Sequence, residues 1–134
     1  MMGFPARFAR AADALVGTPY RLHGRDPQQG LDCVGLVLCA IAQAGRQPSD
    51  LPTYGLRNVG LERLLPFAAK NGFMQTVELQ EEGDLLLINS GPAQHHLLIA
   101  ADRSTYVHAH AGRRHVVRES GLQQASVVHR WRSA

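Results

Sequence analysis

Apolar residues recur at helical spacing along the first half of the chain, and this spacing predicts helices there. Three helices are expected, over Phe4–Val16, Cys33–Ala44 and Leu61–Lys70. Gly17 and Gly45 follow the first two, as is common where a chain leaves a helix. The third is expected to end near Gly72, and Pro66 weakens its first half because a proline inside a helix removes a hydrogen bond.

Prolines and glycines interrupt the pattern between the helices, so we expect Thr18–Leu31 to be a loop and Gln47–Asn58 to be irregular. Beyond Gly72, short runs of strand-forming residues are separated by turn residues. Five strands are predicted, over Asp84–Ile88, Gln94–Ala101, Thr105–His110, His115–Arg118 and Ser126–Trp131. Helices followed by a meander of strands are typical of an α+β fold. Without a linker or an internal repeat, residues 1–134 are expected to form one domain.

The composition indicates the class of protein but does not indicate a specific function. The 134 residues are 45% hydrophobic and 19% charged, which is typical of an ordinary globular domain. The net charge is +3, but the arginines are scattered and form no basic stripe with interleaved aromatic residues, so we expect no nucleic-acid partner. An anionic substrate remains compatible with this surface. For Arg113, Arg114 and Arg118 we favour a solvated strand edge over binding of substrate carboxylates.

Neither a membrane span nor a signal peptide is expected. No apolar run has the length needed to cross a bilayer. The first sixteen residues contain Arg7 and Arg10, but Asp13 interrupts their apolar stretch. We therefore expect the protein to be made in the cytoplasm.

The two cysteines have different expected environments. Cys33 and Cys39 lie six residues apart on one predicted helix and so face different sides, which argues against a disulfide between them. Cys39 lies among apolar residues and is interpreted as a small buried hydrophobic side chain. Cys33 lies where the helix begins, where unpaired N–H groups and the helix dipole favour the thiolate. We therefore expect Cys33 to be the reactive thiol.

A nucleophilic thiol needs an imidazole base and a group that orients this base. His96 and His108 lie on two predicted strands joined at Asp102–Ser104. Antiparallel pairing about Arg103 would place position 96 opposite His110 and diagonal to position 108. A shift in register would exchange the two, so the sequence leaves open whether His108 or His110 orients His96.

The histidines also allow a different interpretation, a metal site. His108 and His110 share a strand face and, with Cys33 or His96, could bind zinc. The chain has neither helical ligand spacing nor a Cys-x-x-Cys pair, so we predict no metal and no other cofactor. His95 is expected to be exposed or to cap a strand. Surface positions are also expected for His23, His115 and His129.

Five short motifs occur in an order that resembles the NlpC family of bacterial papain-like cell-wall endopeptidases. They are Gly17-Thr18-Pro19-Tyr20-Arg21, Asp32-Cys33-Val34-Gly35-Leu36-Val37, Gly83-Asp84-Leu85-Leu86, His96-x-x-Ile99 and Val107-His108-Ala109. The resemblance spans roughly Leu15 to the C-terminus, and five motifs in order are far more specific than one. The resemblance implies a papain-like core in which N-terminal helices pack on a five- or six-stranded antiparallel sheet.

The resemblance also implies roles for individual residues. Cys33 would be the nucleophile, His96 the general base and then acid, and His108 the residue that orients His96. The Tyr20 hydroxyl would help to hold the oxyanion, together with the Cys33 backbone N–H. Asp32 would position the loop or a substrate amine. The implied substrate is the peptide stem of peptidoglycan, cut between D-glutamate and a diamino acid.

Three departures from the family pattern favour one branch. Val34 stands where the family commonly has serine, Leu22-His23-Gly24 replaces a frequent glycine pair, and Leu98 stands where glycine is frequent. These features resemble the branch found in phage tails and gene-transfer-agent particles, whose proteins would then be partners. The resemblance implies that the protein acts after incorporation in such a particle or after release. Two alternative functions remain: a thiol amidase or acyltransferase acting on another substrate, and a non-catalytic tail-tip or wall-binding module.

Overall fold

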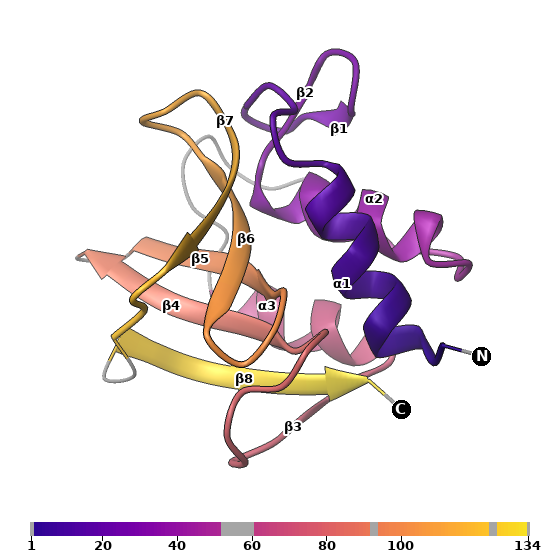
Figure 1. The fold of residues 1–134 in the computed structure, drawn as a ribbon, viewed down its shortest axis with the longest axis vertical. Coiled ribbons are helices and arrows are strands. Elements are labelled where there is room, and N and C mark those ends of the chain that lie inside the picture. The colour runs from indigo at the N-terminus through magenta and orange to yellow at the C-terminus, as the bar shows by residue number, and fades with distance from the viewer. Residues whose placement is uncertain (1, 52–60, 92–93, 124–125, 134) are drawn as a thin grey trace.

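Three helices lie against one side of a strongly twisted antiparallel sheet in the computed structural model (Figure 1). The structure describes residues 2–51, 61–91, 94–123 and 126–133. The helices are α1 (Phe4–Ala14), α2 (Cys33–Gln43) and α3 (Leu61–Lys70). Within these ranges, no helix is both long and apolar enough to cross a membrane.

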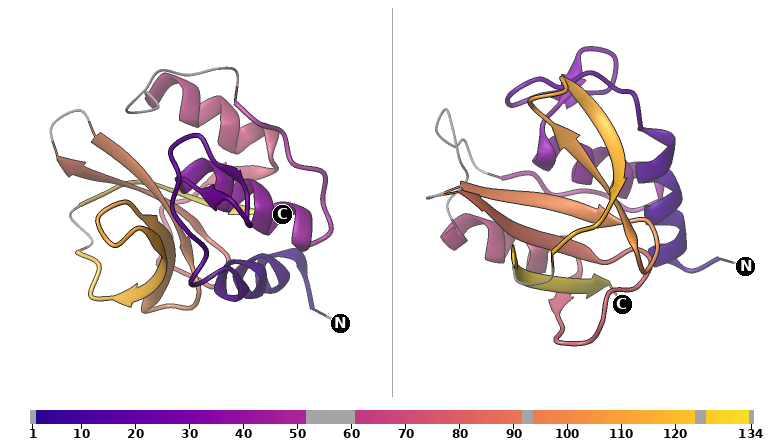
Figure 2. Two further views of the ribbon diagram at one scale, coloured as in Figure 1. Left: turned by 90° about the horizontal axis from the view of Figure 1, so that it is seen from above. Right: turned by 60° about the vertical axis from the view of Figure 1, so that its left-hand side comes forward.

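The main sheet has six antiparallel strands in the order β3-β8-β4-β5-β6-β7. Their bounds are β3 (Phe73–Gln75), β4 (Leu85–Gly91), β5 (Gln94–Ala100), β6 (Thr105–His110), β7 (His115–Ser120) and β8 (Val127–Ser133). Figure 2 shows the β6–β7 hairpin turning away from the direction of β4 and β5. The expected α+β class and the five- or six-stranded antiparallel sheet are confirmed.

The predicted elements differ from the observed ones mainly at their ends. Helices α1 and α2 end at Ala14 and Gln43, one or two residues earlier than predicted, and strand ends shift by up to three residues. Strand β3 was not predicted, because three residues are too few to establish an alternation. Part of the irregular segment expected over 47–58 lies outside the described residues.

One expectation about a proline- and glycine-rich segment is wrong, whereas the helix predicted over Leu61–Lys70 is confirmed. The loop predicted over 18–31 contains a small antiparallel pair, β1 (Arg25–Asp26) and β2 (Gly30–Leu31). Helix α3 continues through Pro66 without a break in its assigned range. Its neighbours Leu64 and Phe67 are buried in the core, and this tertiary packing offsets the hydrogen bond that the proline removes.

The core lies between the helices and one face of the sheet. Alternate residues of β4 and β5 face it, among them Leu87 and Ile99, because successive strand residues point to opposite faces. Phe4 and Phe8 of α1 contact Phe73 of β3, with ring centroids 6.3 and 5.4 Å apart, respectively. These contacts join the first helix to the far edge of the sheet, and the opposite face of β5 and β6 remains available for other side chains.

A buried ion pair holds the C-terminal strand to the entry of β4. Asp84 is 0% exposed, and Arg132 of β8 donates to both its carboxylate oxygens at 2.8 and 2.9 Å. Arg118, in contrast, pairs with Asp13 and Asp102 at the surface, where all three side chains are well exposed. A carboxylate without water depends on its partner far more than an exposed one does.

We therefore predict different costs for removing these two arginines. Arg132→Ala leaves the Asp84 charge buried without its partner and should lower the free energy of unfolding by about 3 kcal/mol or more. Arg118→Ala should lower it by less than about 1 kcal/mol. Urea denaturation followed by circular dichroism measures both. Equal losses for the two variants would contradict the assignment of the Asp84–Arg132 pair as the structurally important one.

Candidate active site

The candidate nucleophile Cys33 is the first residue of α2, and the preceding Asp32 caps this helix. Asp32 is 4% exposed, and its Oδ1 accepts hydrogen bonds from the Gly35 backbone N–H at 2.8 Å and from the Arg25 guanidinium at 2.9 Å. Its Oδ2 accepts from the His23 backbone N–H at 2.9 Å. Asp32 thereby satisfies a helix donor and holds the preceding loop in place.

Gly35 lets this loop lie directly on the first turn of α2. A Cβ atom at this position would come 2.0 Å from the Gly24 carbonyl oxygen, so no larger residue fits without moving the backbone. Glycine at this position therefore allows the close packing of the loop on the helix.

Tyr20 reaches the site from a segment that bridges two strands. Its backbone N–H donates to the Arg114 carbonyl at 2.8 Å, and the Pro19 carbonyl accepts from the Leu31 N–H at 2.8 Å. Tyr20 is half-buried and lies near Cys33 and Asp32, whose negative forms raise its pKa in addition to burial. The structure thus brings the predicted tyrosine to the thiol, with its hydroxyl in the protonated form.

The sheet opens where Cys33 approaches it. Strand β5 pairs with β6 only at Ile99↔Val107 and Ala100↔Tyr106, a register centred on Arg103 as predicted. Ala100 donates its N–H to the β4 side, so the N–H of Leu97 points to the opposite side, toward β6. There it donates to the Cys33 sulfur instead of to a strand. The thiol is thereby held beside the residue that follows His96.

His96 and His108 form a hydrogen-bonded chain with Glu119. The His96 Nε2 lies 2.9 Å from the His108 Nδ1, and the His108 Nε2 lies 2.5 Å from a Glu119 carboxylate oxygen. All three side chains come from the same face of β5, β6 and β7, opposite the helices. Of the two alternatives that the sequence left open, His108 is the one hydrogen-bonded to His96.

Burial decides the charge state of this site at rest. It raises the pKa of the Cys33 thiol to about 11; the nearby Asp32 carboxylate raises this pKa too, whereas the N–H groups of Leu97 and Val34 and the Arg25 guanidinium lower it. Burial, with the neighbouring His108 and His110, lowers the pKa of His96 to about 4. The expected lowering of the thiol pKa by the helix start is therefore wrong, and at neutral pH both groups are uncharged.

Glu119 was missed by the sequence-based prediction, since a single glutamate in a strand has no recognisable spacing. Only the register of β6 and β7 could have identified Glu119. It pairs with Tyr106 across these strands and therefore lies diagonal to His108. Hydrogen bonding from His108 lowers the pKa of the Glu119 carboxyl group, which is therefore ionised.

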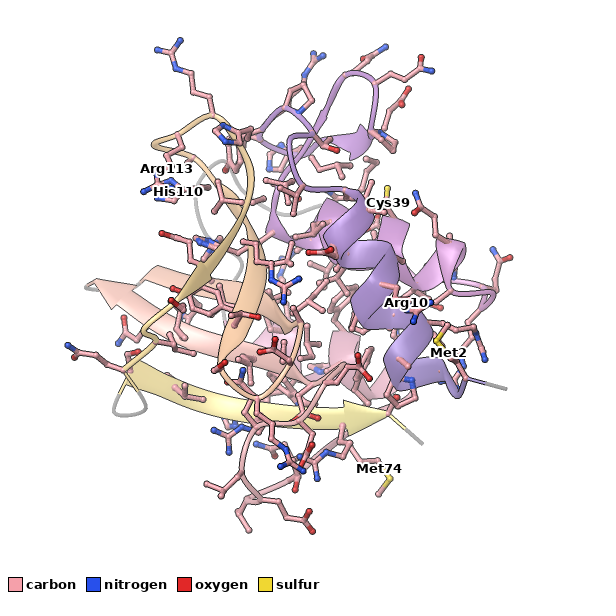
Figure 3. All side chains as sticks on the ribbon, in the orientation of Figure 1. Met2, Arg10, Cys39, Met74, His110 and Arg113 are labelled. Atoms are coloured by element: carbon pink, nitrogen blue, oxygen red, sulfur yellow. The ribbon has the colours of Figure 1, made fainter. Side chains whose placement is uncertain are left out.

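The remaining candidates lie outside this cluster. The His110 ring centroid is 5.3 Å from that of His108, and its Nδ1 accepts from the Arg113 backbone N–H. Figure 3 shows His110 and Arg113 together at the end of the β6–β7 hairpin. Among the residues that the structure describes, no group of three or more His, Cys, Asp or Glu side chains is placed to hold a metal ion.

Cys39 and the other histidines occupy surface or half-buried positions. Cys39 is partly exposed, which corrects the expectation of a fully buried side chain, and its sulfur contacts the Arg25 carbonyl at 3.5 Å. Figure 3 places it on α2, away from the hairpin that bears His110. His23 and His115 are exposed, as predicted, whereas His95 and His129 are half-buried.

Comparison with solved structures shows the same architecture over nearly the whole chain. The NlpC/p60 domain of the peptidoglycan hydrolase SagA is 26% identical, with a TM-score of 0.65 over 94% of this chain and 96% of that one. The peptidoglycan hydrolase RipB from Mycobacterium tuberculosis is 19% identical, with a TM-score of 0.66 over 96% of this chain and 64% of that one.

A longer NLP/P60-family protein from Staphylococcus aureus is 16% identical, with a TM-score of 0.66 over 97% of this chain. This chain spans only 41% of that protein's length. No curated protein sequence matches the chain. The family model described as NlpC/P60 matches residues 17–133, a range that contains the thiol, both hydrogen-bonded histidines and Tyr20. This chain therefore belongs to the NlpC/P60 family.

Proposed function

We propose that this protein is a cysteine endopeptidase that hydrolyses amide bonds in the peptide stem of peptidoglycan, between D-glutamate and a diamino acid. The supporting observation is the hydrogen-bonded pair of His96 and His108 beside the thiol at the start of α2. The NlpC/P60 family is one of cysteine peptidoglycan hydrolases, and SagA and RipB are named as such hydrolases. A thiol, an imidazole base and a group that orients this base are the parts that acyl transfer requires, and we assign these roles to Cys33, His96 and His108.

The proposed reaction begins with the site uncharged. The His96 Nε2 is engaged by His108, so its Nδ1 takes the thiol proton as the Cys33 sulfur attacks the scissile carbonyl carbon. The tetrahedral intermediate collapses when His96 returns this proton to the leaving amine, and an acyl-enzyme remains on Cys33. Water, deprotonated by His96, then attacks the thioester carbonyl and releases the new carboxylate and the free thiol.

The oxyanion that forms during each attack needs donors already in place. We assign the Cys33 backbone N–H, at the positive end of α2, and the Tyr20 hydroxyl to this task. Tyr20 is suited to it because its raised pKa keeps the hydroxyl protonated and because hydrogen bonds on both sides of its segment fix its backbone. Asp32 acts by positioning the loop and the helix, since its carboxylate already accepts three hydrogen bonds.

We also propose a biological setting, a phage tail or a gene-transfer-agent particle in which the enzyme opens the cell wall during DNA delivery. This proposal rests on Val34 after the nucleophile, on Leu22-His23-Gly24 and on Leu98, which resemble that branch of the family. The other proteins of such a particle would be its partners.

The first prediction about the proposed reaction concerns cleavage of purified muropeptides, followed by mass spectrometry. The wild-type protein should release two fragments whose summed mass exceeds that of the substrate by one water. Cys33→Ser should lower kcat by about 10³-fold or more, because the hydroxyl is a far weaker acid than the thiol. Cys39→Ser, which changes the other thiol in the same helix, should leave kcat unchanged.

The same assay separates the alternative functions. A product in which the acyl group is attached to an added amine or alcohol would identify an acyltransferase instead. Binding to the wall without cleavage, equal in the wild type and in Cys33→Ser, would identify a wall-binding module. Cleavage that survives Cys33→Ser would contradict the proposed nucleophile.

The second prediction concerns the charge state of the resting thiol. Because the pKa of Cys33 is about 11, its alkylation by iodoacetamide should accelerate across the whole alkaline range in which the protein stays folded. The rate should rise about tenfold for each pH unit, in proportion to the thiolate fraction. Measurement in Cys39→Ala leaves a single thiol to observe. A rate that levels off near the ordinary thiol pKa of about 8.5, or below it, would contradict the uncharged resting state.

The third prediction concerns the acidic side of the activity profile. Since kcat/KM reports the pKa of the base in the free enzyme, it should stay high as pH falls through the usual histidine pKa of about 6.5. It should fall only as pH approaches about 4, where His96 becomes protonated.

Folding must be monitored in the same buffers, because the lowered pKa of His96 makes the fold less stable as pH falls from the unfolded-state value toward about 4. Circular dichroism at each pH supplies this control. An activity limb centred near 6.5 in protein that is still folded would show that His96 is not buried as a neutral base.

A further inference from the structure

Glu119 ends the hydrogen-bonded chain that begins at His96. Its side chain is 29% exposed, whereas that of His108 is 10% exposed, so the carboxylate is more accessible to water than the ring that it contacts. The second carboxylate oxygen of Glu119 lies 3.8 Å from an Arg113 nitrogen. The carboxylate therefore has one close partner, the His108 ring, and one distant cation.

The Glu119 carboxylate determines which nitrogen carries each hydrogen in the hydrogen bonds that link Glu119, His108 and His96. An ionised carboxylate can only accept, so the hydrogen between Glu119 and His108 is on the His108 Nε2. Burial lowers the pKa of His108 in spite of the Glu119 carboxylate, so its ring is neutral at pH 7.5; a neutral imidazole has one donor and one acceptor, and the His108 Nδ1 must therefore accept. The hydrogen between the two rings is then on the His96 Nε2, and the His96 Nδ1 is left unprotonated.

We propose that Glu119 is a positioning residue that sets the tautomer of His108 and, through it, the tautomer of His96. Its catalytic consequence rests on the proposed function, in which the unprotonated Nδ1 of His96 accepts the proton of Cys33. Without Glu119 the opposite arrangement satisfies the His96–His108 hydrogen bond equally well. The His108 Nδ1 would then donate, and the His96 Nδ1 would hold a hydrogen and could not act as a base.

No neighbouring side chain described in the structure takes over this task. The Nδ1 of His110 already accepts the Arg113 backbone N–H, and its ring packs beside that of His108 without a hydrogen bond between them. Tyr106 packs on the same ring, with centroids 5.3 Å apart. Glu119 supplies the acceptor that the His108 Nε2 contacts.

The deciding experiment uses Glu119→Gln, which keeps the size of the side chain but can either accept from or donate to His108. In ¹⁵N-histidine NMR above about pH 7.5, where a ring of ordinary pKa is neutral, the wild-type protein should give an unprotonated Nδ1 and a protonated Nε2 at His96. In Glu119→Gln the two tautomers of His96 and His108 should mix. The variants His96→Gln and His108→Gln assign the two rings.

Muropeptide turnover should change in parallel. Glu119→Gln should lower kcat by roughly 10- to 100-fold at unchanged KM, the range found when a partner that orients a functional histidine is removed. Glu119→Asp keeps a carboxylate and should recover most of the loss. Arg113→Gln removes the distant cation but leaves the carboxylate, and should preserve both the tautomers and kcat.

The outcomes separate this inference from the proposed function. Tautomers that do not change in Glu119→Gln would overturn the inference, whether kcat falls or not. Altered tautomers in a protein whose wild type does not cleave muropeptides would support the positioning by Glu119 and reject the proposed function. Altered tautomers with kcat unchanged would overturn the catalytic part of the inference.

Discussion

The buried carboxylate of Asp32 is the interaction on which the candidate site depends. It caps α2, fixes the His23 backbone and pairs with Arg25, and these three contacts hold the loop against the helix end that presents Cys33. A buried charge requires partners of this kind, because without them its desolvation would cost several kcal/mol. Asp32 thus determines both where the thiol lies and which charges surround it.

The same contact explains why the site is uncharged at rest. The start of a helix favours a thiolate, but a carboxylate one residue earlier opposes it, and removal of water opposes it further. Removal of water from the half-buried His96, with the neighbouring His108 and His110, lowers the pKa of its ring to about 4. The burial that surrounds Cys33 and His96 therefore also keeps both groups neutral until substrate binds.

Much of the architecture could be predicted because it follows from local patterns in the sequence. Three helices, five of the six strands of the main sheet and the register about Arg103 follow from periodicity and turn residues. The pair β1–β2 and strand β3 could not be predicted, since two or three residues have no period to detect. Helix α3 contains Pro66 although proline disfavours helix interiors, because tertiary packing of this helix outweighs that preference.

The sequence pattern selects candidate residues for the site but does not predict their electrostatics. Motifs and strand spacing select Cys33, His96 and His108 as candidates, and the structure adds the diagonal hydrogen bond between His96 and His108. The thiol pKa depends on burial and on the orientation of Asp32, which are properties of the folded chain. Glu119 likewise comes to His108 only through the pairing of β6 with β7.

The opening between β5 and β6 explains how a helix on one side of the sheet can serve histidines on the other. Side chains at positions 96 and 108 point away from the helices, so a fully paired sheet would separate them from Cys33. Because pairing stops at Ile99, the Leu97 N–H is free to donate to the sulfur. The twist that turns the β6–β7 hairpin away from β5 is therefore a requirement of the site: a flatter sheet with the same residues would bury the thiol against a closed surface.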